Sequence, residues 1–434
     1  MIPEKNEKVG RIDDVIIAPD SSVSYAIVGA GGFLGVGKHD IAIPASQLTQ
    51  QDGKFVLPGA SKRRSRRCLS SSMPGRSSRK TRGRKAKRLL RFRFALLLLP
   101  VAIVGPTWGL DSGELPRAPR LHGSFRNLDP DFWSASNWTR VRFYLMGFST
   151  MLKLENAYAP LPRAVPDVGA LRKNRQASTV TWVGHSTLLV QLDGVNVLTD
   201  PTWSLRVGPW SGRLGVRRFT PPGIAFDDLP PIDIVLISHD HYDHLDEATV
   251  RRLARTFNPR FVVPLGIRAW LADRGITDVS ELDWSESITV KGVKIVCTPA
   301  QHGSGRDLLD SGQRLWASWV VIGSKRFYFG GDSGYAPHLA MIGEALGPFD
   351  LAALPIGSYT PREIARPVHM SPEEALQASL DLRSTRFIGI HWGTFELARE
   401  PYDEPPRRIA AEVARLKLDP RSIWLPKPGE TLGW

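Results

Sequence analysis

The sequence predicts an α/β protein in which two packed β-sheets carry helices on their outer faces, preceded by a small β-barrel-like module. Two observations carry this prediction. Beyond residue 178, apolar runs typical of β-strands alternate with helical stretches, and short strand patterns punctuated by Gly fill residues 8–58. A chain of 434 residues is also longer than one hydrophobic core usually requires, so appended segments are expected.

Residues 1–60 are expected to form the β-barrel-like module. Its short strand patterns alternate apolar and polar residues and are separated by Gly and Asp, which favour turns. The stretch GRIDDVIIAPDSSVSYAIVGAGGFLGVGKHDIAIPASQL, residues 10–48, resembles bacterial PRC-barrel modules. That resemblance implies a module for interaction rather than catalysis.

The positive charge of the chain is concentrated in residues 61–93. Between Lys62 and Arg93 there are 15 Lys or Arg and no Asp or Glu, so the net charge of +14 leaves −1 for the rest of the chain. A composition rich in Arg, Lys and Ser without apolar periodicity predicts a disordered linker. Nucleic acid is not an expected partner, because a nuclease needs its basic groove on the catalytic part.

The linker is followed by an apolar segment, residues 94–110. It carries no charge, but its dense apolar core ends near Val104 and is interrupted by Pro100. This length fits a signal-peptide core or an anchor with a positive flank; a membrane-surface segment and a buried helix are the alternatives. An uncleaved anchor would leave the domain that follows it on the periplasmic side of a bacterial inner membrane, with a cytoplasmic peripheral location as the alternative.

Residues 111–170 are rich in Pro and aromatic residues and are expected to form an arm, with a helix at 140–153 and no visible chemistry. Residues 171–434 form the main domain. Its strand patterns lie at 178–184, 186–192, 195–200, 232–238, 260–265, 293–298, 318–323, 326–331 and 349–357. Its helical patterns lie at 247–255, 267–274, 373–382 and 406–415. This mixture indicates two sheets with helices outside.

The candidate chemistry begins where the apolar strand 232–238 ends. It delivers a loop of metal-ligand residue types before a helix expected near Asp246: His239, Asp240, His241, Tyr242, Asp243 and His244. Alternate residues of an extended backbone face one way, so His239 and His241 are expected to meet at one point, with Asp243 and His244 directed to an adjacent point. The only cysteines, Cys68 and Cys297, are too few for a thiolate cluster or a disulfide framework.

Three further apolar strands end in metal-ligand residue types, at His302, Asp332 and His391. Taken singly, each is more often a buried structural histidine or a turn aspartate. Together with the loop they complete a set that predicts two zinc ions per chain. We assign the first zinc to His239, His241 and His302, the second to Asp243, His244 and His391, and Asp332 as the bridge between them.

Two adjacent cations would lower the pKa of a shared water and produce a hydroxide nucleophile. They would also neutralise charge that builds on the substrate oxygens in the transition state. Asp243 and Asp332 are therefore expected to belong to the catalytic machinery as well as to the metal site.

The pattern HDHYDH, followed by His302, Asp332 and His391, is similar to that of the metallo-β-lactamase superfamily and implies its αβ/βα sandwich. Segments such as TWVGHSTLLVQLDGVNVLTDP, FGGDSGYAP and IHWGTFELA resemble, in the same order, the N-acylphosphatidylethanolamine-hydrolysing phospholipase D family over residues 179–434. This resemblance implies zinc at the seven positions and cleavage of the phosphodiester between phosphatidate and an N-acylethanolamine.

Tyr359 and His369 resemble family positions near the reaction site. His369 is expected in the catalytic set as a group that orients substrate, with a loop histidine without a role as the alternative. It lies just before a helix start at which Ser371, Pro372 and Glu374 predict a capping box.

Three other polar residues are left outside the ligand set. His185 in WVGHST is expected at a turn, with contact to the metal ligands as the alternative. Asp200 and Asp240 have the same two alternatives, a role in a turn or contact with the metal ligands.

The predicted function is a zinc-dependent hydrolase, a phospholipase D that cleaves N-acylphosphatidylethanolamine-like lipids at a membrane surface. After His302 the chain reads GSGRDLLDSGQRLW, without the bulky residues expected beside a lipid headgroup. This departure favours the alternative of a lactonase or a soluble phosphodiesterase on the same scaffold. A membrane-tethered adaptor with an inactive hydrolase is the non-enzymatic alternative, against which the intact ligand set argues.

Overall fold

The computed structural model describes residues 10–17, 23–30, 39–44, 49–51, 54–56, 115–129, 158–307 and 310–434. The chain divides into two compact units, Met1–Ala102 and Ile103–Trp434. The basic linker, the apolar segment and the helix expected at 140–153 lie outside the described residues. Within the described part, no helix has both the length and the apolar character needed to cross a membrane.

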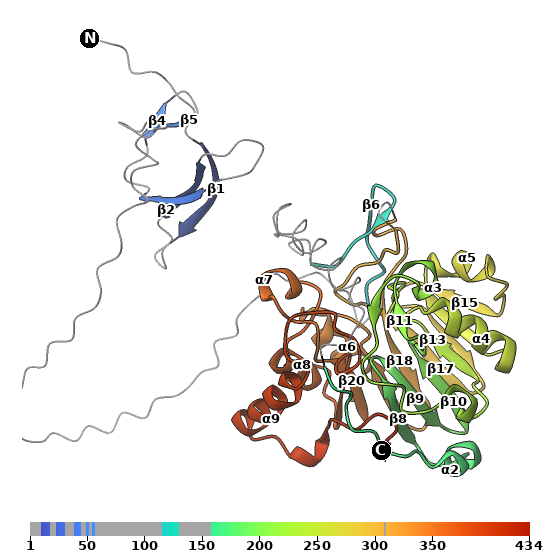
Figure 1. Cartoon of the computed structure of the whole chain (residues 1–434). Helices are drawn as coiled ribbons and strands as arrows, with labels where there is room; N and C mark the ends of the chain where they lie inside the picture. The colour runs from blue at the N-terminus through green and yellow to red at the C-terminus, as the bar shows by residue number, and fades with distance from the viewer. Residues whose placement is uncertain are drawn as a thin grey trace, which may run out of the picture. The chain divides into compact units, whose positions relative to one another are not determined.

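The first unit contains the short strands expected for a small β-module (Figure 1). Three of them form an antiparallel sheet: β1 (Gly10–Ile17), β2 (Val23–Ala30) and β3 (His39–Pro44). The strands β4 (Thr49–Gln51) and β5 (Lys54–Val56) pair as a hairpin. The register between β1 and β2 shifts twice, and such bulges bend and twist a strand.

The second unit contains two sheets of seven strands among the described residues. In the first sheet the order is β15-β14-β13-β10-β9-β8-β23, with β8 (Thr179–Gly184), β9 (Thr187–Leu192), β10 (Val195–Thr199), β13 (Ile234–Leu236), β14 (Arg260–Pro264), β15 (Val279–Leu282) and β23 (Thr431–Gly433). In the second it is β16-β17-β18-β19-β20-β21-β22, with β16 (Ser287–Val290), β17 (Val293–Thr298), β18 (Ser318–Ile322), β19 (Arg326–Phe329), β20 (Leu351–Pro355), β21 (Phe387–Ile390) and β22 (Ile423–Trp424).

The two sheets pack face to face around one apolar core. Trp182 and Val190 of the first sheet belong to the same buried cluster as Trp319 and Phe329 of the second. Each fully buried side chain of this size contributes about 1.5–3 kcal/mol relative to exposure. Both faces of β9 are buried, which explains why Leu188, Leu189 and Val190 follow one another without an alternating polar residue.

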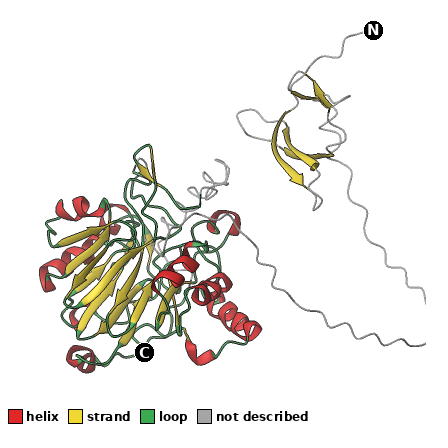
Figure 2. Ribbon diagram, turned by 180° about the vertical axis from the view of Figure 1, so that it is seen from behind, coloured by secondary structure: helices red, strands yellow, loops and turns green. Residues whose placement is uncertain are grey.

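Helices cover the outer face of each sheet, so the layers run helix, sheet, sheet, helix (Figure 2). The first sheet carries α4 (Glu247–Phe257) and α5 (Ile267–Ala272). The second carries α6 (His338–Leu346), α8 (Pro372–Asp381) and α9 (Glu404–Leu416). The capping box predicted at Ser371 is present, with its hydroxyl accepting from the backbone N–H of Glu374. The expected αβ/βα sandwich is thus the observed fold.

The short helix α2 (Val168–Lys173) packs Leu171 into the same outer layer of the first sheet. Other short elements are α3 (Pro209–Gly212) and α7 (Arg362–Ala365), the hairpin of β6 (Arg120–Leu121) and β7 (Ser124–Phe125), and the hairpin of β11 (Arg206–Val207) and β12 (Val216–Arg217).

Strand directions place the site. β10 and β13 run parallel in the first sheet, and β19, β20 and β21 run parallel in the second. β8 and β17 are each separated from a parallel neighbour by one antiparallel strand, so they share its direction. The carboxyl ends of these strands therefore meet at one edge of the sandwich, which we call the metal edge.

Candidate metal centre

The histidine-rich loop lies between β13 and α4 at the metal edge. Its end is fixed by Asp246, whose carboxylate accepts hydrogen bonds from the backbone N–H groups of Trp203 and Ser204. The helix α4 starts directly after Asp246, as the sequence predicts. Because both ends of the loop are held by buried structure, its side chains can be aimed with little freedom.

Three predicted ligands of the first metal converge. Nε2 of His239 lies 2.8 Å from Nδ1 of His241, and Nε2 of His302 lies 3.2 Å from that same Nδ1. His239 and His302 are buried, while His241 is partly exposed. Burial holds the pKa of both buried imidazoles well below its usual range, so they stay neutral, as metal ligation requires.

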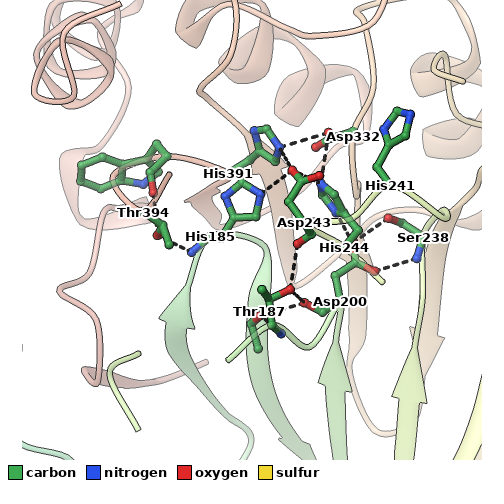
Figure 3. A network of polar contacts seen from close by, with 12 residues as sticks. His185, Thr187, Asp200, Ser238, His241, Asp243, His244, Asp332, His391 and Thr394 are labelled. Atoms are coloured by element: carbon green, nitrogen blue, oxygen red, sulfur yellow. Dashed lines mark hydrogen bonds and ion pairs between the residues drawn. The ribbon is translucent and has the colours of Figure 1, made fainter. Parts of the chain in front are cut away.

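The predicted ligands of the second metal form an adjacent group. Oδ2 of Asp243 lies 3.3 Å from Nε2 of His244 and 3.5 Å from Nε2 of His391. Figure 3 shows these side chains around a common point. The histidine-rich loop supplies Asp243 and His244, and His391 follows β21 of the other sheet.

Asp332 lies between the two groups. Its Oδ2 is 3.1 Å from Nε2 of His391, 3.2 Å from Nε2 of His244 and 3.8 Å from Nε2 of His302. This is the position expected of a bridging carboxylate. Gly331 before it has φ +56° and no room for a side chain, since a Cβ would lie 2.5 Å from the Cβ of Ser238. The Gly-Gly-Asp turn therefore lets the carboxylate approach the histidine-rich loop closely.

The residues present fit a pair of divalent cations. Nε2 of His244, Nε2 of His391 and Oδ1 of Asp332 are buried and make no hydrogen bond among the described residues. Burial lowers the pKa of His244, but Asp332, Asp243 and Asp200 outweigh it and hold that pKa well above its usual value. Three carboxylates thus favour positive charge at this point. Buried donors and acceptors that converge on one point without a protein partner are suited to coordinate a metal ion.

A buried carboxylate orients one of these ligands. Asp200, directly after β10, lies 2.7 Å from Nδ1 of His244 through Oδ2, and it accepts hydrogen bonds from both the N–H and the hydroxyl of Ser238. Histidine ligands commonly donate their second ring nitrogen to such a partner, which fixes the tautomer and the ring orientation. Asp200 therefore orients the ring of His244 and is not itself one of the seven predicted ligands.

His185 also reaches the centre. It occupies a turn after β8 with φ +54°, as expected, but its Nε2 lies 2.9 Å from Oδ2 of Asp243. Burial lowers the pKa of His185 to about 3, so the ring is neutral. A turn role alone is therefore an incomplete description, because the turn directs the ring onto a predicted metal ligand.

Asp240 points away from the two groups. Oδ2 of Asp240 pairs with Arg314 at 2.8 Å, and Oδ1 accepts from the N–H of Gly305. It thereby ties the histidine-rich loop to the segment after His302, where the sequence departs from the family. In that segment Arg306 stacks over the ring of Tyr242 at 4.1 Å and donates to the carbonyl of Asp240.

His369 lies next to the centre. Its Nδ1 is 3.9 Å from Oδ2 of Asp332, and its ring centroid is 5.3 Å from that of His302 and 5.4 Å from that of His391. Burial lowers the pKa of His369 to about 4, so the ring is neutral at pH 7. Tyr359, by contrast, is buried and donates its hydroxyl to Glu404 on α9. The expectation that Tyr359 lies near the reaction site stays a prediction.

One residue of the arm contributes although no chemistry was expected there. The side chain of Asn127 accepts from the N–H of His302 at 3.0 Å and donates to its carbonyl at 2.7 Å. The indole of Trp316 donates to the same Asn127 oxygen. Asn127 thus fixes the backbone of a predicted ligand, and a lone asparagine in a Pro-rich segment gave no signal of this role.

Two family models match the chain. The one described as Beta-lactamase superfamily domain covers residues 195–392, and the one described as PRC-barrel domain covers residues 2–63. All seven predicted metal ligands lie within the first of these ranges.

Three relatives are similar to more than half of the chain. An uncharacterized protein of Mycobacterium tuberculosis (strain ATCC 25618 / H37Rv) is 41% identical over 315 residues, 71% of this chain and 82% of its own. N-acyl-phosphatidylethanolamine-hydrolyzing phospholipase D 1 of Caenorhabditis elegans is 44% identical over 252 residues, 55% of this chain and 70% of its own. A UPF0173 metal-dependent hydrolase of Methanopyrus kandleri is 31% identical over 258 residues, 58% of this chain and 98% of its own.

The fold, the clustered ligands and these matches define a metal-dependent hydrolase of the metallo-β-lactamase superfamily. The chain carries a PRC-barrel domain ahead of the hydrolase. Within the superfamily it belongs to the family of the N-acylphosphatidylethanolamine-hydrolysing phospholipases D, as its identity to the nematode relative shows.

Proposed function

We propose that this chain is a zinc-dependent phosphodiesterase of the phospholipase D type that acts on N-acylphosphatidylethanolamine-like lipids, with two zinc ions per chain. The observation that carries the metal part is the position of Asp332 between two groups of imidazoles. The lipid part is supported by the relative of that activity at 44% identity.

The donor set favours zinc over harder cations. The seven residues are five imidazoles and two carboxylates, and magnesium or calcium would prefer oxygen ligands throughout. Asp332 would bridge the ion held by His239, His241 and His302 and the ion held by Asp243, His244 and His391. When bound, two such ions lower the pKa of water and offset negative charge on a phosphate group.

The chain's own residues around the centre would position the reacting groups. His369 is neutral at pH 7, so one ring nitrogen can donate and the other can accept. Its place beside Asp332 suits a hydrogen bond to a phosphate oxygen or to the departing oxygen of the substrate. His185 would hold Asp243 in orientation, and Asp200 would do the same for His244.

The test measures metal content and hydrolysis on the purified full chain in detergent. We expect about two zinc ions per chain and metal-dependent release of N-acylethanolamine from N-acylphosphatidylethanolamine. Asp332→Asn should lower both, while Asp273→Asn, the same change at an exposed carboxylate after α5, should leave both unchanged.

The outcomes separate the two parts of the proposal. Two zinc ions without release would keep the metal centre and reject the lipid assignment. Absence of bound metal in a folded wild-type chain would reject both.

We further propose that residues 94–110 anchor the chain and that the hydrolase faces the periplasm of a bacterial cell. The support is the basic flank formed by residues 61–93. A reporter enzyme that works only outside the cytoplasm, fused after Trp434, should be active. Activity only of a cytoplasmic reporter at the same position would contradict this topology.

A further inference from the structure

Two hairpins stand on the metal edge beside the predicted ligands. Asn127, two residues after β7, holds the backbone of His302, so the β6–β7 hairpin is joined directly to the centre. The β11–β12 hairpin packs Val207 and Val216 against Phe395. The ring of Phe395 in turn contacts that of His185, with centroids 5.2 Å apart. Figure 1 shows β6 projecting beyond the ends of the sheets.

The tips of both hairpins expose large apolar side chains. At the tips, Leu121 is 52% exposed and Trp210 is 72% exposed; Leu205, which directly precedes β11 at the base of its hairpin, is 60% exposed. Six large apolar side chains are exposed among the described residues, and these three make up half of them. Exposed apolar groups that gather at one place mark an interaction site, whereas scattered ones need no explanation.

The backbone presents Trp210 rigidly and against its own preference. Trp210 has φ +55°, a conformation that costs a bulky residue free energy and that persists only where the surroundings enforce it. The enforcement is visible at Gly208 and Gly215, where an added Cβ would lie 2.2 Å from the carbonyl oxygen of Leu214 and 2.1 Å from that of Val207, respectively. The two backbone segments of the hairpin therefore approach each other closely, and its tip exposes the indole of Trp210 to solvent.

The charge of the two segments has one sign. Residues 115–128 and 201–223 together contain seven Arg and no Asp or Glu. Arg213 is exposed near Trp210, and Arg120 is exposed and stacks over Phe125 at 4.1 Å. Tryptophan and arginine together suit the boundary of a lipid bilayer, where the indole lies at the headgroup level and the guanidinium binds phosphate.

We propose that the β6–β7 and β11–β12 hairpins dock on an anionic lipid bilayer and present the metal edge to the lipid headgroups. This proposal rests on the lipid substrate proposed above. Arg117 pairs with Glu286 and Asp283, and Arg218 is buried, so the exposed arginines beside the tips are Arg120, Arg126 and Arg213. A second copy of the chain or another segment of it would also bury the apolar tips, but neither explains these exposed arginines. Each arginine near such a surface is worth roughly fivefold in binding.

The test reports on each tip separately, because the basic linker could bind vesicles by itself. An environment-sensitive fluorophore is attached to Trp210→Cys or Leu121→Cys in a full-length Cys68→Ser background, in which the remaining Cys297 is buried. Leu380→Cys on α8 is the matched control, since Leu380 is 42% exposed but lies outside both hairpins. Vesicles contain phosphatidylcholine and phosphatidylglycerol in equal parts.

We expect the labels at 210 and 121 to shift to the blue on these vesicles and to be quenched by lipids brominated in the acyl chains, while the label at 380 does neither. Labels at 210 and 121 that stay unshifted on vesicle-bound protein would overturn the proposal. A blue shift without vesicles would also overturn it. A shift that depends on protein concentration would show that a second copy buries the tips, and one that does not would show that another segment of the same chain buries them.

Hydrolysis keeps the failure of this proposal distinct from that of the lipid assignment. Trp210→Ser with Arg213→Ser should release product several-fold more slowly from vesicles than wild type, and at the wild-type rate from a monomeric short-chain substrate. Leu380→Ser should match wild type on both. Release from vesicles with unshifted labels would overturn the docking alone, whereas shifted labels without release from any lipid would support the docking and reject the lipid assignment.

Discussion

Replacing Asp200 with asparagine changes one atom behind the second ligand group. The carboxylate accepts three hydrogen bonds, at 2.7 Å from the N–H of Ser238, 2.6 Å from its hydroxyl and 2.7 Å from Nδ1 of His244. An asparagine amide has one oxygen and one NH₂ group, so it cannot accept all three. Either the NH₂ faces the N–H of Ser238, or it faces Nδ1 of His244.

Both arrangements are unfavourable. Facing Ser238 places two buried donors against each other, which costs about 1–3 kcal/mol. Facing His244 turns its Nδ1 into an acceptor and moves the ring proton to Nε2, the atom directed at Asp332 and Asp243, where a metal ligand must be free of a proton. Partners of this kind are worth about 10–100-fold in metal affinity, which corresponds to about 1.4–2.7 kcal/mol.

The assay is competition for zinc with a chromophoric chelator on the purified chain. Asp200→Asn should weaken one of two binding events by roughly 10–100-fold and leave the other close to wild type. Asp193→Asn is the matched control, because Asp193 accepts from Ser324 in a turn between β9 and β10, away from the metal edge. Two zinc affinities equal to wild type in Asp200→Asn would refute the reasoning.

Further predictions follow from single contacts. His185→Leu removes the partner of Asp243 and should weaken one zinc affinity in the same assay without lowering the thermal midpoint of the metal-free chain by more than about 5 °C. Arg314→Leu leaves Asp240 buried without its ion pair and should cost about 3 kcal/mol in denaturant unfolding, whereas Arg421→Leu, at a fully exposed pair, should leave the unfolding midpoint unchanged. Removing the metals with a chelator should lower stability by about 4 kcal/mol if free zinc had stood at a thousandfold excess over its dissociation constant; an unchanged thermal midpoint would argue against a bound metal. Burial lowers the pKa of His338 from 6.5 to about 3, so below pH 6.5 the unfolded chain takes up a proton that the folded chain refuses. Stability should fall as pH drops from 6.5 towards 3, and His338→Gln should remove roughly 2 kcal/mol of the loss between pH 7 and pH 5.

Much of the site is predictable because ligands follow strands. His239, His302, Asp332 and His391 each come after an apolar run, and strands of one direction end at one edge. That rule requires only the sequence and the polarity of parallel strands. The αβ/βα layers follow in the same way, from strand patterns alternating with helices such as α4 and α9.

Other contacts depend on how distant segments pack, and the sequence carries no sign of them. Asn127 meets His302 across 175 positions, from a stretch of the arm for which no element was expected. His185 looks like a turn residue because it is one, and its contact with Asp243 arises only when β8 and the histidine-rich loop are adjacent. Tyr359 was placed by resemblance alone, and its hydrogen bond to Glu404 on α9 is a contact that the sequence did not signal.

The central claim is that two zinc ions share Asp332. The most direct measurement is a crystal structure of the chain grown with zinc, with anomalous data collected above and below the zinc absorption edge. We predict two zinc peaks, one within bonding distance of His239, His241 and His302 and the other within bonding distance of Asp243, His244 and His391, with Asp332 bound to both. A single peak, or two peaks with Asp332 bound to only one of them, would contradict it.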